Sequence, residues 1–79
     1  MEKAILSAQS YGHVELRLAQ ILEQKGMNRN TLARRIGTRF EVVDRWYCGD
    51  MEKLDLDILA RICYVLDCSI SDIIVYHAD

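Results

Sequence analysis

The sequence predicts one compact, all-α domain with five short helices. Its 79 residues are too few to divide between two hydrophobic cores, while 51% of them are hydrophobic, which suffices for a single core. Proline is absent and there are only four glycines, so few positions oppose helix formation. Apolar residues recur three and four positions apart along most of the chain, which is the spacing of the buried face of a helix.

The N-terminal part is predicted to consist of an arm and a first helix. Residues 1–13 should form the arm, either loose or part of a dimer contact, ahead of a domain that spans residues 14–79. The first helix should end at Gly26, a residue suited to a left-handed C-cap. Before that helix, Val14 and Leu16 alternate with charged residues, which fits a short extended lead-in as well as an early helix start.

A second and a third helix are expected in close succession. Asn28 is a favourable N-cap for the second helix, and Gly37 is placed to end it. Thr38 and Glu41 have the spacing of a capping box, in which each side chain accepts a hydrogen bond from the other residue's backbone N–H. The third helix is therefore predicted at about residues 39–48.

Two further helices are expected before the C-terminus. The fourth should begin near Asp55, and the fifth is short, with Ser69 as its cap and Asp72 at its third position. The final residues, 75–79, fit a frayed turn or a brief strand. The side chains expected to face the core from these two helices are Ile58 or Leu59, Ile62, Cys63, Leu66, Ile70, Ile73 and Ile74.

Charge is unevenly distributed along the chain. The net charge is −2, but residues 25–53 carry a net charge of +3 and residues 54–79 carry −4. A basic block of this kind is either a solvated face or the footprint of a nucleic-acid partner.

The sequence contains no pattern typical of a catalytic or metal site. No nucleophile is paired with a general base and no glycine-rich phosphate loop is present, so an enzyme is not expected. Cys48, Cys63 and Cys68 lack the paired spacing of zinc ligands and are expected to be reduced thiols in a cytoplasmic protein. No cofactor, metal or small-molecule ligand is expected. No segment approaches the roughly 20 apolar residues of a membrane-spanning helix, and the N-terminus does not resemble a secretory signal.

The middle of the chain carries the features of a helix-turn-helix. Two short helices joined by a turn that contains glycine form the skeleton of this DNA-binding motif. Ala33 is small enough to let the next helix cross closely above it. Val43 and Trp46, three residues apart, should fix the third helix to the core and leave its opposite face free for a major groove. This arrangement predicts double-stranded DNA as the partner.

These features resemble the lambda-repressor-like family, also described as Cro-type or xenobiotic-response-element regulators. The resemblance extends from about Val14 to Tyr76 and implies a compact five-helix DNA-binding domain. The residues that carry it are Leu32-Ala33, Gly37-Thr38, Val43 with Trp46, Gly49, Leu59, Ile62-Cys63, Leu66-Asp67-Cys68 and Asp72-Ile73-Ile74.

The resemblance also implies roles for individual residues. The base-reading residues are expected on the outward face of the third helix, namely Arg39, Phe40, Glu41 and Arg45. Arg45 is the best candidate for direct readout, because its forked guanidinium can bind both acceptors of a guanine. Phosphate contacts are expected from Asn28 and Arg29 at the start of the second helix, with Arg35 and Lys53 as further candidates. Asp44 is expected on the flank of the third helix.

The function implied is that of a sequence-specific transcriptional repressor of phage or bacterial type. It would bind as a homodimer, with half-sites about 34 Å apart. The alternative is a protein-interaction module that keeps the fold but has lost DNA binding. Glu41 and the acidic loop 50–52 favour this alternative, and Phe40 and Val42, exposed together, would form its apolar anchor.

Overall fold

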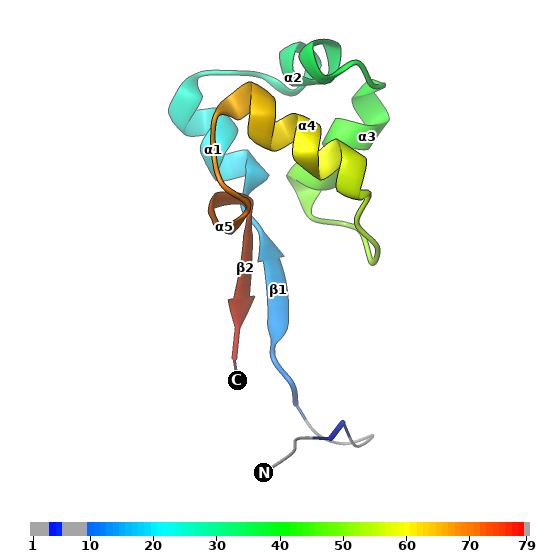
Figure 1. The fold of residues 1–79 in the computed structure, drawn as a ribbon, viewed down its shortest axis with the longest axis vertical. Coiled ribbons are helices and arrows are strands. Elements are labelled where there is room, and N and C mark those ends of the chain that lie inside the picture. The colour runs from blue at the N-terminus through cyan, green and yellow to red at the C-terminus, as the bar shows by residue number, and fades with distance from the viewer. Residues whose placement is uncertain (1–3, 6–9, 79) are drawn as a thin grey trace.

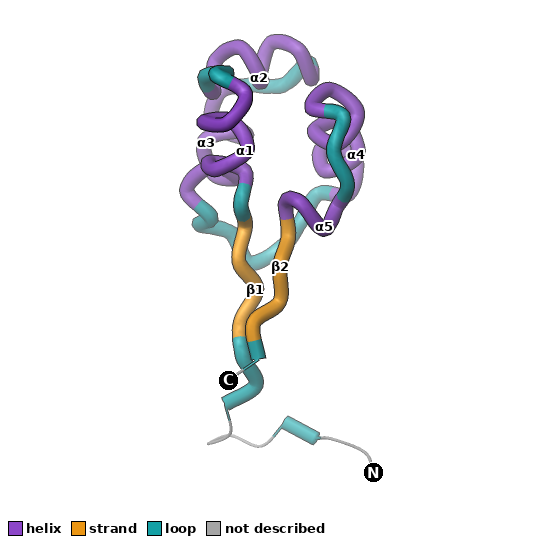
Figure 2. Tube along the Cα trace, turned by 90° about the vertical axis from the view of Figure 1, so that its left-hand side faces the viewer, coloured by secondary structure: helices purple, strands orange, loops and turns teal. Residues whose placement is uncertain are grey.

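The computed structural model describes residues 4–5 and 10–78. In chain order its elements are β1 (His13–Leu16), α1 (Leu18–Lys25), α2 (Arg29–Ile36), α3 (Phe40–Cys48), α4 (Leu56–Leu66), α5 (Ile70–Ile73) and β2 (Ile74–His77). The helices pack into one unit, and the two strands project from it side by side as a ribbon (Figure 1, Figure 2). In the part of the chain that is described, no helix is long and apolar enough to cross a membrane.

The five predicted helices are present because each supplies apolar side chains to one shared core. Trp46 is the largest of the fully buried side chains, and only 1% of it is exposed. Both Ile58 and Leu59 are buried, so the alternative between them is resolved in favour of both. The core of the described residues consists of Leu18, Ile21, Leu22, Leu32, Ala33, Ile36, Val43, Trp46, Ile58, Leu59, Ile62, Leu66 and Ile73.

Local hydrogen bonds confirm most of the predicted helix ends. The Asn28 side chain accepts a hydrogen bond of 2.8 Å from the backbone N–H of Thr31, and so caps α2. Asp55 caps α4 in the same way, accepting from the N–H groups of Asp57 and Ile58 at 2.9 and 3.2 Å. These bonds satisfy backbone donors that the first turn of a helix leaves without partners.

The predicted capping box between Thr38 and Glu41 is wrong. Helix α3 begins at Phe40, and Arg39 is its N-cap residue, without a side-chain hydrogen bond to the backbone. The backbone N–H of Thr38 instead donates to the carbonyl of Ala33 at 3.0 Å, which completes the C-terminus of α2. Because only three residues separate the two helices, Thr38 is used to end the first and is too early to start the second.

The prediction for α5 is correct at its start and wrong for one of its three isoleucines. The Asp72 carboxylate accepts from the Ser69 backbone N–H at 2.9 Å, as in the predicted capping box. Ile73 is completely buried, whereas 57% of Ile70 is exposed. Ile74 is half-buried and packs against the core, so this helix of four residues directs its end, and not its start, into the core.

The all-α expectation is corrected by a two-stranded antiparallel sheet. The register pairs His13 with His77 and Leu16 with Ile74. Val14 and Leu16 therefore belong to a strand, as one of the two interpretations of their alternation allowed. The tail likewise forms a strand, which begins one residue before the predicted segment 75–79.

Glycine is required where the chain enters this ribbon. Gly12 has a φ of 82°, and a Cβ atom placed on it would lie 2.2 Å from the carbonyl oxygen of His77. Any other residue would therefore be strained in its backbone and would also push the strands apart. The hydroxyl of Tyr76 donates to the carbonyl of Tyr11 at 2.7 Å and closes this end of the ribbon.

A charged cluster links the two strands. Glu15 Oε1 lies 3.0 Å from Arg17 Nε and 2.8 Å from His77 Nε2, a residue 62 positions away in the sequence. The hydrogen bonds from His77 and then from Arg17 hold the pKa of Glu15 below its ordinary value. A carboxyl group whose pKa is lowered by folding stabilises the fold above its unfolded pKa, and this stabilisation is lost as the pH falls through the lowered value.

We therefore expect the ribbon to loosen in acid as Glu15 becomes protonated. The measurement is the NMR chemical shift of the β1 and β2 amides between about pH 6 and about pH 3, a range that spans carboxyl titration. Glu15→Gln should abolish this component of the pH response. Identical titration curves for the variant and the parent protein would show that Glu15 does not link the strands.

Arg61 ties α4 to the end of α2. Its Nη1 donates to the backbone carbonyl of Ile36 at 3.0 Å, and its Nη2 lies 2.8 Å from Asp57 Oδ2 one turn earlier in α4. The Ile36 carbonyl is one of those that the last turn of α2 leaves without a helical partner. Arg61 thus satisfies the end of the helix that leads into the turn before α3.

Replacing Arg61 by alanine should lower the free energy of unfolding by about 1 kcal/mol, since the side chain is half exposed and its interactions are weakened by solvent. Urea unfolding followed by the fluorescence of Trp46 measures the loss. Arg34→Ala is the matched control, because Arg34 is exposed on α2 and has no ion pair with any residue in the described ranges. Equal effects of the two substitutions would contradict this role of Arg61.

Candidate nucleic-acid interface

Helices α2 and α3 form a helix-turn-helix with its inner side closed. Val43 is completely buried, as predicted, and Trp46 is nearly so. Ala33 of α2 is also buried in the core, where its small side chain permits close approach of the two helices. Gly37 adopts a φ of 72° at the end of α2, a left-handed conformation that turns the chain toward α3. The packing leaves the opposite side of α3 in solvent.

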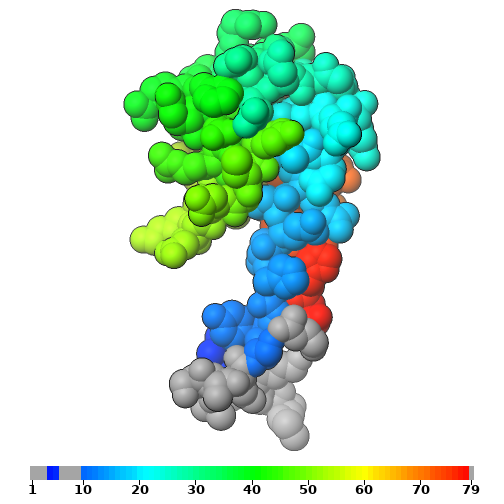
Figure 3. All heavy atoms as spheres, turned by 180° about the vertical axis from the view of Figure 1, so that it is seen from behind, coloured from blue at the N-terminus to red at the C-terminus, as the bar shows by residue number. Residues whose placement is uncertain are grey.

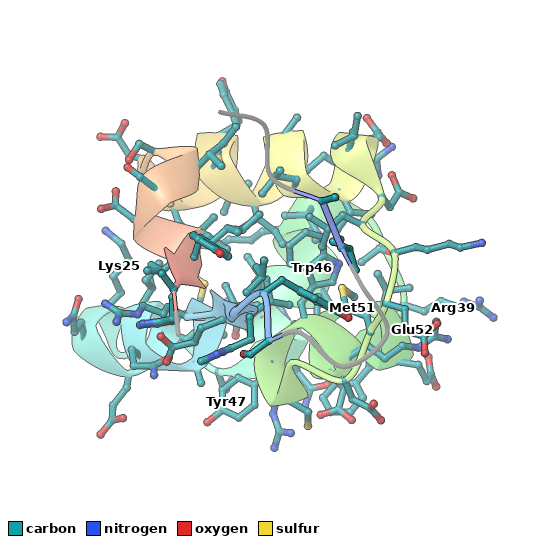
Figure 4. The ribbon with its side chains drawn as sticks, turned by 90° about the horizontal axis from the view of Figure 1, so that it is seen from below. Lys25, Arg39, Trp46, Tyr47, Met51 and Glu52 are labelled. Atoms are coloured by element: carbon teal, nitrogen blue, oxygen red, sulfur yellow. The ribbon has the colours of Figure 1, made fainter. Side chains whose placement is uncertain are left out.

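The outward face of α3 lies on the surface of the molecule. Figure 2 places α3 and α4 on opposite sides of the helical unit, and Figure 3 shows α3 exposed on the side away from α4. The helical repeat of about 100° per residue places Glu41 and Arg45 opposite the buried pair of Val43 and Trp46. Both side chains are exposed. Arg39, directly before the helix, is exposed and extends away from the protein (Figure 4).

Two arginines on this side have no acidic partner. Arg39 and Arg45 form no ion pair with any residue in the described part of the chain. Because no carboxylate binds them, these two arginines keep their hydrogen-bond donors available for a ligand. Glu41, with no cap to form, is likewise without a hydrogen bond or ion pair among the described residues.

Arg29 is the exception, because its guanidinium group contacts one flank of α3. Arg29 Nη1 lies 2.5 Å from Asp44 Oδ1. The guanidinium carbon lies 4.5 Å from the centre of the Tyr47 ring and 5.5 Å from that of the Phe40 ring. This cluster was not predicted from the sequence, although Phe40, Asp44 and Tyr47 have the spacing of one helical flank.

The two residues at the start of α2 remain near the candidate interface. Asn28, Arg29 and Tyr47 line a depression of about 300 Å³ between the end of α1 and the start of α2. The side-chain oxygen Oδ1 of Asn28 accepts the capping hydrogen bond from Thr31, which leaves the side-chain NH₂ group free to donate to another acceptor. Asn28 therefore has a donor beside the flank of α3, as a phosphate contact requires.

The other two phosphate candidates lie apart from this depression. Arg35 lines a separate groove of about 320 Å³ between α2 and α4, together with Ala60 and Tyr64. The structure therefore does not bring Arg35 together with the outward residues of α3. Lys53 is exposed in the loop that follows α3. The loop is anchored by Met51, which is half-buried and packs against the core (Figure 4).

The apolar anchor expected for a protein-interaction module is not formed as predicted. Val42 is half-buried and packs against the core, so it is not exposed together with Phe40. Phe40 is 37% exposed and lies beneath Arg29. The two side chains are separated because Val42 lies on the same side of α3 as Trp46, whereas Phe40 lies on the flank next to α2.

The cysteines and acidic residues form no metal centre in the described ranges. Within residues 4–5 and 10–78 no group of three or more His, Cys, Asp and Glu side chains is arranged to hold a metal ion. Cys48 is exposed, Cys63 and Cys68 are half-buried, and all three are free thiols. Burial raises the pKa of the Cys68 thiol, which keeps it protonated at neutral pH.

Comparison with known proteins gives results consistent with this geometry. The family of Cro/C1-type HTH DNA-binding domains matches residues 17–79. Among solved structures, a candidate DNA-binding protein from Bacteroides fragilis is similar with a TM-score of 0.67 and 22% identity, over 80% of this chain and 100% of that chain. The transcriptional regulator VanUg is similar with a TM-score of 0.69 and 24% identity, over 98% of this chain and 100% of that chain. These two likenesses show the fold. No curated protein sequence matches the chain.

Proposed function

The chain belongs to the family of Cro/C1-type helix-turn-helix DNA-binding domains, and from this membership we propose that it is a homodimeric, sequence-specific transcriptional repressor. The observation that carries the proposal is that Arg39 and Arg45 are exposed and have no ion pair with any described residue. They lie on the solvent side of α3, whose other side is fixed to the core by Val43 and Trp46. A rigid helix with free donors on one face suits the major groove. Repression follows if the occupied site overlaps a promoter.

Base readout is assigned to the outward residues of α3. Arg45 can donate both arms of its guanidinium to the two acceptors of a guanine, and Arg39 can reach a base or a phosphate at the start of the helix. Glu41 can accept from a cytosine amino group, since no helix cap occupies its carboxylate. Phe40 is partly exposed at the edge of the same face and can contact a thymine methyl group.

Phosphate contacts are assigned to Asn28 at the start of α2 and to Lys53 in the loop after α3. Asn28 contributes a side-chain amide and Lys53 a charge that has no acidic partner among the described residues. Arg35 is left out of this set because its groove lies between α2 and α4. A small number of phosphate contacts implies modest affinity for a single domain, which two copies on one palindromic site would overcome.

The surface proposed for the homodimer is the β-ribbon. An isolated two-stranded sheet is at best marginally stable in water. This ribbon exposes Val14 and Tyr76, which are opposite each other in the register, to 59% and 62%. Both of its outer edges also have unpaired backbone groups among the described elements. A second ribbon would cover this apolar pair.

The test of DNA binding is enrichment of the protein's targets from a random pool of duplex DNA at two salt concentrations. We expect a palindromic site and an affinity that falls with salt. Arg45→Ala should weaken binding by about 1–3 kcal/mol and relax the base preference at one position of each half-site. Lys53→Ala, the comparison variant, should weaken binding to all sequences alike and make the salt dependence shallower by about one unit per protomer. No retention of folded protein at low salt would refute the proposal.

The dimer is tested by sedimentation equilibrium of the parent protein and of Val14→Lys. A charge on each copy of the exposed face of β1 should dissociate the dimer, because like charges would be brought together. Leu56→Lys is the control, since Leu56 is a similarly exposed apolar residue on α4, with 73% of its surface in solvent. A monomeric parent protein, or a dimer that Val14→Lys leaves intact, would contradict this surface.

A further inference from the structure

The guanidinium of Arg29 has contacts with one flank of α3 over two helical turns. Asp44 provides the ion pair, at 2.5 Å, and the Tyr47 and Phe40 rings provide the contacts with the guanidinium face, at 4.5 and 5.5 Å. Arg29 is the first residue of α2, whereas its three partners belong to α3. The contacts therefore join the start of one helix of the motif to the middle of the other.

These contacts compete with the phosphate role that the sequence suggested for Arg29. A phosphate bound by the guanidinium would have to displace the Asp44 carboxylate or accept a negative charge beside it. The side chains of Arg29 and Asp44 are only 40% and 39% exposed, so the pair is screened less than one on the open surface. Stacking on Tyr47 further restricts the directions in which the donors of Arg29 can point.

We infer that Asp44 is a positioning residue, which holds Arg29 over Tyr47 so that Arg29 braces the recognition helix against α2 instead of binding a phosphate. The inference rests on the proposed function, in which α3 reads DNA. Arg45 follows Asp44 directly in α3, so a change in the tilt or rotation of this helix would move its guanidinium relative to the base edges. The contacts of Arg29 with Asp44 and Tyr47 therefore contribute to base discrimination, although neither Arg29 nor Asp44 contacts a base.

The first experiment needs no DNA. Arg29→Ala, Asp44→Ala and the double variant are unfolded in urea, and the midpoints are compared in a double-mutant cycle. We expect the double variant to lose clearly less stability than the two single losses combined, because either substitution alone already removes the contact. Additive losses would show that the two residues do not hold each other in solution and would overturn the inference.

The second experiment measures the salt dependence of DNA binding and the preference among sites that differ at the bases read by α3. Asp44→Asn has nearly the shape of the original residue but releases Arg29, so the slope of log affinity against log salt should steepen by about 0.9 per protomer as a new phosphate contact forms. Base discrimination should relax at the same time. Glu52→Gln is the matched control: it removes one negative charge from the exposed loop after α3, where Glu52 has no ion pair within the described residues, and should leave the slope unchanged.

Arg29→Ala separates the two roles of this arginine. If Arg29 is a brace, the variant keeps the parental salt slope and loses base discrimination. If Arg29 binds a phosphate, its slope becomes shallower by about 0.9 per protomer with the base preference intact, and the inference is overturned. If Arg29→Ala does not fold, the salt slope of Asp44→Asn decides between the two roles. An unchanged slope would mean that Asp44 does not keep Arg29 from binding a phosphate, and would overturn the inference. Failure of the parent protein to bind any DNA would refute the proposed function. The unfolding cycle would still test whether Arg29 and Asp44 hold each other in solution.

Discussion

The burial of one side of α3 is the constraint on which the rest of the structure depends. Val43 and Trp46 are inserted into a core to which every helix contributes, and this fixes the rotation of α3 about its own axis. With that rotation fixed, the helical repeat decides that Glu41 and Arg45 point into solvent and that Asp44 and Tyr47 point toward α2. The candidate interface is thus a consequence of core packing, because the burial of Val43 and Trp46 decides which residues of α3 face the solvent.

Polar contacts at the two ends of α2 then further restrain the helix positions that core packing has fixed. Arg61 satisfies the Ile36 carbonyl where α2 ends, and the Arg29–Asp44 pair connects the place where α2 begins to α3. Both arginines are partly exposed, and each has a partner on another helix. They restrain the two ends of α2, one against α4 and the other against α3. Arg39 and Arg45, which are proposed to contact DNA, have no ion pair with any described residue.

The β-ribbon differs from the helical unit in the contacts that hold it together. It projects from the helices and is linked within itself by the Glu15 and His77 contact and by the Tyr76 hydroxyl (Figure 1). Its apolar cross-strand pair is not covered by any described part of the chain. Distinct surfaces are therefore available for the two proposed partners, with α3 facing DNA and the ribbon facing a second copy.

The helices, their caps at Asn28 and Asp55, and the inward direction of Val43 and Trp46 could all be predicted from the local sequence. These features depend on residues within one or two turns of one another, and their spacing is visible in the sequence. The partner of Arg29, the partner of Arg61 at the end of α2 and the pairing of the two strands depend on the tertiary fold. The contacts involved join residues 15, 25 and 62 positions apart, and no local rule specifies which distant groups will meet. The error at Thr38 has a local cause: its spacing fits a helix cap, but its backbone N–H already donates to the carbonyl of Ala33 to end the preceding helix.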